Sequence, residues 1–114
     1  MEIKAENYAV WFEQESNTLT FTGTLRLSGM EEYEPIMQLL NDVAERSPTL
    51  ITLNLQDLKF LNSSGINVLS KFVIKIRQLG NIQVVVRGSE NTPWQAKSLR
   101  NLQRLMPGLS VEFD

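Results

Sequence analysis

Residues 57–65 read Asp-Leu-Lys-Phe-Leu-Asn-Ser-Ser-Gly, and this stretch is the most informative feature of the chain. The preceding residues 50–55 form a short apolar, β-rich run that indicates a buried strand. The following apolar residues, from Ile66 to Leu79, recur at a spacing of about 3.6 residues and predict an amphipathic helix. The small polar residues therefore lie at a strand-to-helix junction, where hydroxyls cap the helix and the dipole favours an anion. Such a junction is either a phosphate site or an ordinary helix cap.

The rest of the chain alternates between strand and helix patterns. Strands are predicted at residues 8–12, 18–25, 50–55, 82–87 and 109–113, and helices from near residues 32–34 to 46, from 63 or 64 to 79, and from 93 to about 105. Ser28 and Glu31 match a capping box that would begin the first helix earlier, but this start would put Pro35 in the second turn. Because proline suits the first turn, the later start is favoured. Thr92, Pro93 and Gln95 together predict an N-cap, a proline at the first helical position and a capping box. Three successive valines predict that strand 82–87 is buried on both faces.

The resulting order, β-β-α-β-α-β-α-β, predicts an α/β fold with a largely parallel sheet and an antiparallel hairpin at its start. At 114 residues, with 42% hydrophobic and 21% charged residues, we expect one globular domain spanning residues 1–114. No apolar run approaches the ~20 residues of a membrane span, and the first residues lack the pattern of a secretory signal. With no cysteine present, these features favour the cytoplasm and argue against direct membrane insertion.

The chain contains no histidine, which excludes a Ser-His-Asp or Cys-His enzyme and the usual nitrogen ligand of a metal. It also lacks a GxxxxGKS phosphate-binding loop. The acidic group Glu31, Glu32 and Glu34 offers two carboxylates for catalysis, but a solvated helix start is the simpler interpretation. We therefore expect no catalytic residue, no metal and no cofactor.

Charge is unevenly distributed along the chain. Residues 1–60 hold four basic and ten acidic side chains, a balance of −6, whereas residues 61–114 hold seven basic and three acidic ones, a balance of +4. Basic helices in the second half are either solvated faces or a surface for an acidic protein, a phosphate-bearing ligand or an anionic membrane. Nucleic acid is not an expected partner, because the chain is acidic overall and has no recognisable reading motif.

Residues 57, 58 and 60–66 resemble the signature of the STAS family, the sulfate transporter and anti-sigma factor antagonist domains. In that family the segment contains Asp and a hydrophobic residue, two further apolar positions, and then Asp-Ser-Ser/Thr-Gly-Leu/Ile. Asn62 stands here where the family has the second aspartate, and it keeps the capping ability without the charge. The resemblance covers nearly the whole chain and implies a mixed β-sheet with its helices packed mainly on one side.

The resemblance also implies a function. In the anti-sigma factor antagonist branch, the serine after the usual aspartate accepts a phosphate, and Ser63 holds that place, with Ser64 as the alternative. Such a protein binds a serine kinase of the anti-sigma factor class, is released when that kinase phosphorylates it, and is reset by a serine phosphatase. The kinase supplies the chemistry, so the chain itself is not expected to be an enzyme.

We expect the partner surface to centre on the start of the second helix. Loops at the carboxyl ends of parallel strands lie together, so we expect the segment after strand 82–87 to belong to the same surface. The expected partner-binding residues are Asn62, Ser63, Ser64, Asn67, Lys71, Gly88, Ser89 and Glu90.

Two alternatives remain open at this point. Some STAS domains are accessory subunits of membrane transport ATPase complexes and need no phosphorylation, and the uncharged Asn62 suits that possibility. A sensor that binds a small anionic ligand at the same helix start is the other.

Overall fold

The computed structural model describes residues 2–114, which form a seven-stranded sheet and three helices. The helices are α1 (Gly29–Glu45), α2 (Ser63–Leu79) and α3 (Pro93–Leu105). The strands are β1 (Glu2–Lys4), β2 (Tyr8–Glu13), β3 (Thr18–Leu25), β4 (Leu50–Asn54), β5 (Leu58–Leu61), β6 (Gln83–Gly88) and β7 (Ser110–Phe113). No helix within residues 2–114 has both the length and the hydropathy that crossing a bilayer requires.

The sheet is mixed, with the strand order β1-β2-β3-β4-β6-β7 and with β5 beside β3. β1, β2 and β3 pair antiparallel, whereas β3, β4, β6 and β7 run parallel. β4 and β5 both pair with β3, one after the other, and the register shifts between Gly23 and Thr24 where β5 takes over. Gly23 has a φ of 89° there, which a residue with a side chain rarely adopts.

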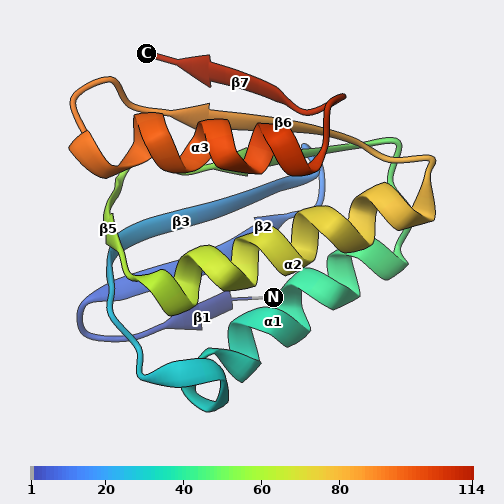
Figure 1. Cartoon of the computed structure of the whole chain (residues 1–114). Coiled ribbons are helices and arrows are strands. Elements are labelled where there is room, and N and C mark those ends of the chain that lie inside the picture. The colour runs from blue at the N-terminus through green and yellow to red at the C-terminus, as the bar shows by residue number, and fades with distance from the viewer. Residues whose placement is uncertain (1) are drawn as a thin grey trace.

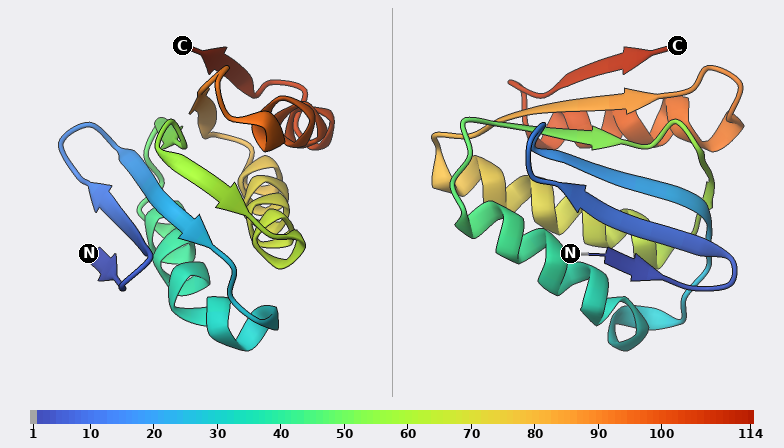
Figure 2. Two further views of the ribbon diagram at one scale, coloured as in Figure 1. Left: turned by 90° about the vertical axis from the view of Figure 1, so that its left-hand side faces the viewer. Right: turned by 180° about the vertical axis from the view of Figure 1, so that it is seen from behind.

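All three helices cover the same face of the sheet (Figures 1 and 2). The strands alternate, so that one set of side chains faces the helices and is buried; it includes Val10 and Phe12, Leu19 and Phe21, Ile51 and Leu53, and Val84 and Val86. This arrangement confirms the predicted mixed sheet with helices on one side. The predicted element order is also present, with β1 and β5 as short additions to it.

The opposite face of the sheet carries no helix from residues 2–114 (Figure 2, right). β6 therefore has one covered face, which holds Val84 and Val86, and one uncovered face, where Val85 is only half-buried. The prediction that this strand is buried on both faces was wrong. A run of three valines is equally compatible with a half-covered strand, because β-branched residues pack well on any pleated sheet.

α1 begins at Gly29, so the prediction of a start near residues 32–34 was wrong. Pro35 lies inside the helix and is exposed, where its missing N–H costs a hydrogen bond. Tyr33 and Ile36, on either side of it, are only 1% and 2% exposed. Burial of these two side chains holds the helix through the proline, so tertiary packing outweighs local propensity here.

Gln95 is fully buried in the first turn of α3. Its Oε1 accepts a hydrogen bond from the Ser89 N–H at 2.7 Å, and its Nε2 donates to the carbonyls of Leu55 at 2.7 Å and Leu58 at 3.2 Å. The predicted capping box was therefore wrong, and Thr92, although it is the N-cap residue, makes no side-chain capping bond. The buried amide instead ties the start of α3 to the ends of β4 and β6.

Replacing Gln95 with Leu should destabilise the fold strongly. The change roughly keeps the volume but removes the partner of three backbone groups, so we expect a loss of about 2–4 kcal/mol in the free energy of unfolding. Urea unfolding followed by circular dichroism measures it. Gln78→Leu, at an exposed position of α2, is the matched control and should change stability by less than about 0.5 kcal/mol. Equal effects of the two substitutions would contradict the anchoring role of Gln95.

Candidate functional site

Ser63 is the first residue of α2, and its side chain is exposed. The chain reaches it from β5, whose last residue, Leu61, is buried and pairs with Leu25 of β3. The predicted strand-to-helix junction is therefore real, and it presents a hydroxyl to solvent. Since the first turn of α2 contains no acidic residue, the positive end of the helix dipole is not neutralised there.

The side chain of Asn62 is the N-cap of α2 and is engaged in three hydrogen bonds. Its Oδ1 accepts from the Gly65 N–H at 3.0 Å and from the Tyr33 hydroxyl at 2.7 Å, and its Nδ2 donates to the Leu27 carbonyl at 2.8 Å. An aspartate could accept the first two bonds but has no N–H for the third. The Asn62 amide thus joins α2 to α1 and to the connection before α1.

These bonds give Asn62 a structural role beside the predicted contact with a partner. Its half-buried side chain holds the backbone from which Ser63 projects. Capping of the second helix by this cluster and the predicted end of the helix at residue 79 are confirmed, and Gly80 follows in the left-handed conformation.

Gly65 and Tyr33 form a pair that sequence reasoning missed. A Cβ built on Gly65 would lie 2.7 Å from the Tyr33 hydroxyl oxygen and closer still to Leu61 Cδ1. Only glycine therefore leaves room for the phenol to reach Asn62 over the first turn of α2. Tyr33 lies 29 residues before Asn62 in the chain, and no local pattern links the two.

Burial raises the pKa of the Tyr33 phenol above its usual value near 10. The hydrogen bond with the Leu27 backbone lowers that pKa, and the nearby Tyr8 adds a smaller upward contribution. The neutral phenol is thus the form that the folded protein prefers, and it is the form that donates to Asn62.

Three of the predicted partner-binding residues form an exposed stripe on α2. Ser63, Asn67 and Lys71 follow one another at intervals of four residues, which places them on one face of the helix. Ser64 lies off this stripe and is half-buried. Ser63 is therefore the more accessible of the two hydroxyls.

The predicted residues 88–90, which are the last residue of β6 and the two that follow it, lie at the same end of the sheet as the start of α2 (Figure 1). Gly88 is buried, the Ser89 N–H is held by Gln95, and Glu90 is exposed. Gln95 also donates to the Leu58 carbonyl at the start of β5, which accepts a second hydrogen bond from the indole of Trp94 at 3.1 Å. The structure thus joins the two segments through the first turn of α3 rather than by direct hydrogen bonds.

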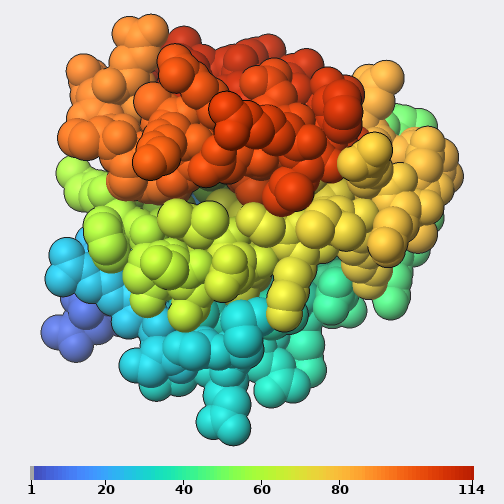
Figure 3. Space-filling view, viewed as in Figure 1, coloured from blue at the N-terminus to red at the C-terminus, as the bar shows by residue number. Residues whose placement is uncertain are grey.

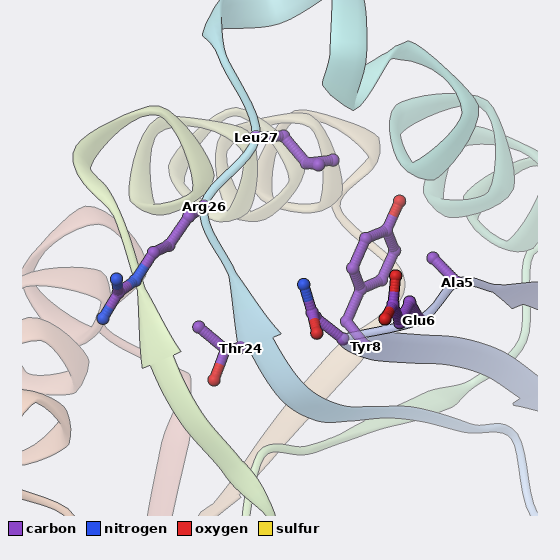
Figure 4. Close-up of a pocket in the computed structure, with 7 residues that line it drawn as sticks. Ala5, Glu6, Tyr8, Thr24, Arg26 and Leu27 are labelled. Carbon is purple, nitrogen blue, oxygen red and sulfur yellow. The ribbon is translucent and has the colours of Figure 1, made fainter.

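A hollow of about 560 Å³ lies on the other side of the connection between β3 and α1 (Figure 4). Tyr8 points toward Leu27 across it, whereas Arg26 extends away, so that its guanidinium lies 4.6 Å from the centre of the Phe60 ring. The lining residues do not converge on one point. A small anion bound in this hollow would need the Arg26 guanidinium, which points away from it. The hollow therefore does not support the alternative that the chain is a sensor of a small anionic ligand. No group of three or more acidic, histidine or cysteine side chains in residues 2–114 is arranged to hold a metal ion.

Comparisons with known proteins support the fold. No protein-family model matches the chain, and no curated protein sequence matches it significantly. One similar structure is a chain in the crystal structure of the diguanylate cyclase SiaD in complex with its activator SiaC from Pseudomonas aeruginosa, with a TM-score of 0.74 and 11% identity over 100% of this chain and 99% of that one.

Two structures of SiaC alone agree with this comparison. SiaC of Pseudomonas aeruginosa matches with a TM-score of 0.68 and 13% identity, over 99% of this chain and 93% of that one. The apo-SiaC crystal structure matches with a TM-score of 0.72 and 13% identity, over 98% and 97%. At these identities the comparison shows a shared fold, which is the STAS-like architecture that the sequence resemblance implied.

Gly65→Ala should destabilise the protein by about 2–3 kcal/mol, although alanine is the better helix former. The added methyl group would displace the Tyr33 hydroxyl or Leu61 from the first turn of α2. Thermal and urea unfolding measure the effect. Gly108→Ala is the matched control, because nothing lies within 4 Å of its added Cβ. A neutral Gly65→Ala would contradict the close approach.

Tyr33→Phe should lower stability by about 0.5–1.5 kcal/mol at neutral pH, through loss of one hydrogen bond. Because the folded-state pKa is raised, the contribution of Tyr33 is complete below pH 10 and is lost as the pH rises through the raised value. The free energy of unfolding of the natural sequence should therefore fall more steeply above pH 10 than that of Tyr33→Phe. Tyr8→Phe retains Tyr33 and should keep the steeper fall. Parallel curves for all three proteins would reject this account.

Proposed function

We propose that this chain is a regulatory protein that binds a protein partner over the start of α2 and releases it when Ser63 is phosphorylated. The observation that carries the proposal is the exposed Ser63 hydroxyl at the first position of a helix whose N-cap is held by three hydrogen bonds. The serine is accessible to a kinase, and the backbone beneath it is fixed.

The electrostatics of the junction suit such a switch. A phosphate on Ser63 adds roughly −1.5 to −2 charges at pH 7. The N-terminus of α2 stabilises an anion by about 0.3–1 kcal/mol, and the first turn holds no carboxylate to repel it. A partner surface closed over Ser63 would instead have to bury an unpaired dianion, at a cost of several kcal/mol. Modification therefore weakens binding without disturbing the fold.

The comparisons support a protein partner. SiaC, whose fold this chain shares, is the activator of the diguanylate cyclase SiaD and forms a complex with it. By the resemblance to the antagonist branch, the partner proposed for this chain is a serine kinase of the anti-sigma factor class, and a serine phosphatase resets it. The chain acts as substrate and messenger, and its partner supplies the catalysis.

Incubation with a serine kinase of the anti-sigma factor class and ATP should add one phosphate, located at Ser63 by mass spectrometry. Protein purified from the organism that produces it should also carry phosphate on Ser63. Ser63→Ala should abolish it, whereas Ser64→Ala, at the half-buried neighbour, should leave it intact. Phosphate on Ser63→Ala at the natural level would reject the site.

The second half of the switch is loss of binding. A Ser63→Asp protein should bind the kinase at least about tenfold more weakly, whereas Ser64→Ala binds normally. Titration calorimetry with both partners purified measures the difference. Equal binding by Ser63→Asp and the natural sequence would favour a constitutive accessory subunit instead.

A further inference from the structure

The seam between α1 and α2 separates opposite charges. α1 has no basic residue, and its charged side chains are Glu31, Glu32, Glu34, Asp42 and Glu45. α2 has no acidic residue, and its charged side chains are Lys71, Lys75 and Arg77. One ion pair, Lys75 with Glu45 at 4.0 Å, crosses the seam at its far end. Nearer the start of the helices, no ion pair within residues 2–114 involves Glu31, Glu34 or Lys71. The charges of these three side chains are therefore available to a binding partner.

A groove of about 390 Å³ lies along this seam, between the two helices. Its apolar part is made by Met30 and Met37, which are half-buried and pack on the hydrophobic core. Its charged rim is formed by Glu31 and Glu34 from α1 and by Lys71 from α2. The lining residues belong to α1 and α2, which appear with α3 as successive bands on one face of the molecule (Figure 3).

The floor of the groove leads toward the core. Met37 and Lys71 also line a smaller cavity of about 40 Å³, whose other walls include Leu40, Val68 and Phe72. Methionine side chains are unbranched and adapt to the shape of an inserted group. An apolar side chain from outside could therefore enter between Met30 and Met37 without displacing rigid neighbours.

The groove adjoins the proposed phosphorylation site. α1 and α2 run in roughly the same direction, and their starts lie on the same side of the molecule (Figure 1). Lys71 belongs to the exposed stripe that begins at Ser63, and eight helical residues span about 12 Å. A helix of a few turns lying in the seam would therefore extend over Ser63.

We propose that this groove binds an amphipathic helix of the partner protein. A groove between two helices fits a third helix, whose apolar ridge would lie between Met30 and Met37. Charge complementarity requires a basic flank facing Glu31 and Glu34 and an acidic flank facing Lys71. A phosphate on Ser63 would repel that acidic flank. This inference rests on the proposed function, because it names the kind of partner that the same surface binds.

Binding of two fluorescent helical peptides to the unphosphorylated protein tests the proposal. Both carry the same ridge of leucines; the first has lysines on one flank and glutamates on the other, and the second has glutamates on both. The natural sequence should bind the first peptide at least about tenfold more tightly, by fluorescence anisotropy. Glu31→Lys with Glu34→Lys makes both rims basic and should reverse the preference. Glu15→Lys with Glu112→Lys makes the same charge change at exposed sites elsewhere and should leave it unchanged.

Methionine methyl signals in NMR show where the peptide binds. The chain has four methionines, and Met106, the C-cap residue of α3 and only 9% exposed, serves as an internal reference. Signals of Met30 and Met37 should move on addition of the first peptide, while that of Met106 stays. The proposal fails if the natural sequence does not distinguish the peptides or if Met30 and Met37 do not respond. It also fails if those two signals move with protein concentration alone, which would assign the groove to a second copy of the chain.

These results separate the groove from the switch. Loss of the peptide preference, with phosphate still accepted at Ser63, rejects the groove and leaves the proposed function standing. A clear preference together with no phosphate on Ser63 supports the groove and rejects the switch. A preference that Ser63→Asp weakens supports the link between the two.

Discussion

The hydrogen bonds of the Asn62 side chain are the interaction on which the candidate site depends. One amide connects the first turn of α2, the Tyr33 hydroxyl of α1 and the Leu27 carbonyl before α1. All three contacts are directional, so together they fix where α2 begins and how it is oriented against α1. Gly65 makes the arrangement possible, because the Tyr33 hydroxyl occupies the space that a side chain there would need. The exposed Ser63 therefore projects from a backbone segment that these hydrogen bonds hold in place.

A second buried amide plays a similar part at the neighbouring strand. Gln95 binds backbone groups at Leu55, Leu58 and Ser89, and so joins the ends of β4 and β6 to the segment that leads into β5. Within residues 2–114, no buried side-chain nitrogen or oxygen lacks a hydrogen-bond partner. Fully satisfied networks of this kind specify one arrangement, because breaking any single bond leaves a buried polar group unpaired. The loops around Ser63 are thus ordered by polar contacts as well as by packing.

One-sided coverage of the sheet explains how the charges can act. Since α1, α2 and α3 share one face, their outer sides form a continuous surface (Figure 3). The acidic α1 and the basic α2 and α3 then lie side by side, and the excess of negative charge in the first half of the chain meets the positive excess of the second half on this surface. A partner that spans the seam between α1 and α2 experiences both signs at once. Such a surface favours one orientation of a partner and disfavours others.

Local sequence patterns predicted most of the helices and strands and the position of Ser63 at the start of α2. Alternating and helical spacings are local properties, and so are caps such as Asn62 and Gly80, which is why α2 was predicted with its observed bounds. The order of these elements predicted the α/β sheet with its first hairpin, and the resemblance of residues 57–66 to the STAS signature implied that the helices pack on one side. Local rules failed where packing overrode propensity, as for Pro35 within α1, and where four residues were too few to show a pattern, as for β5.

The contacts that hold the site together come from packing between segments that are distant in the chain. The hydroxyl of Tyr33 meets Asn62 across 29 residues, and Gln95 reaches Leu55 across 40, so neither contact leaves a periodic or local signal in the chain. The groove of Met30 and Met37 likewise exists only because α1 and α2 pack with their starts together. Hydrogen bonds and cavities between distant segments depend on three-dimensional distance, whereas sequence patterns report only what neighbouring residues have in common.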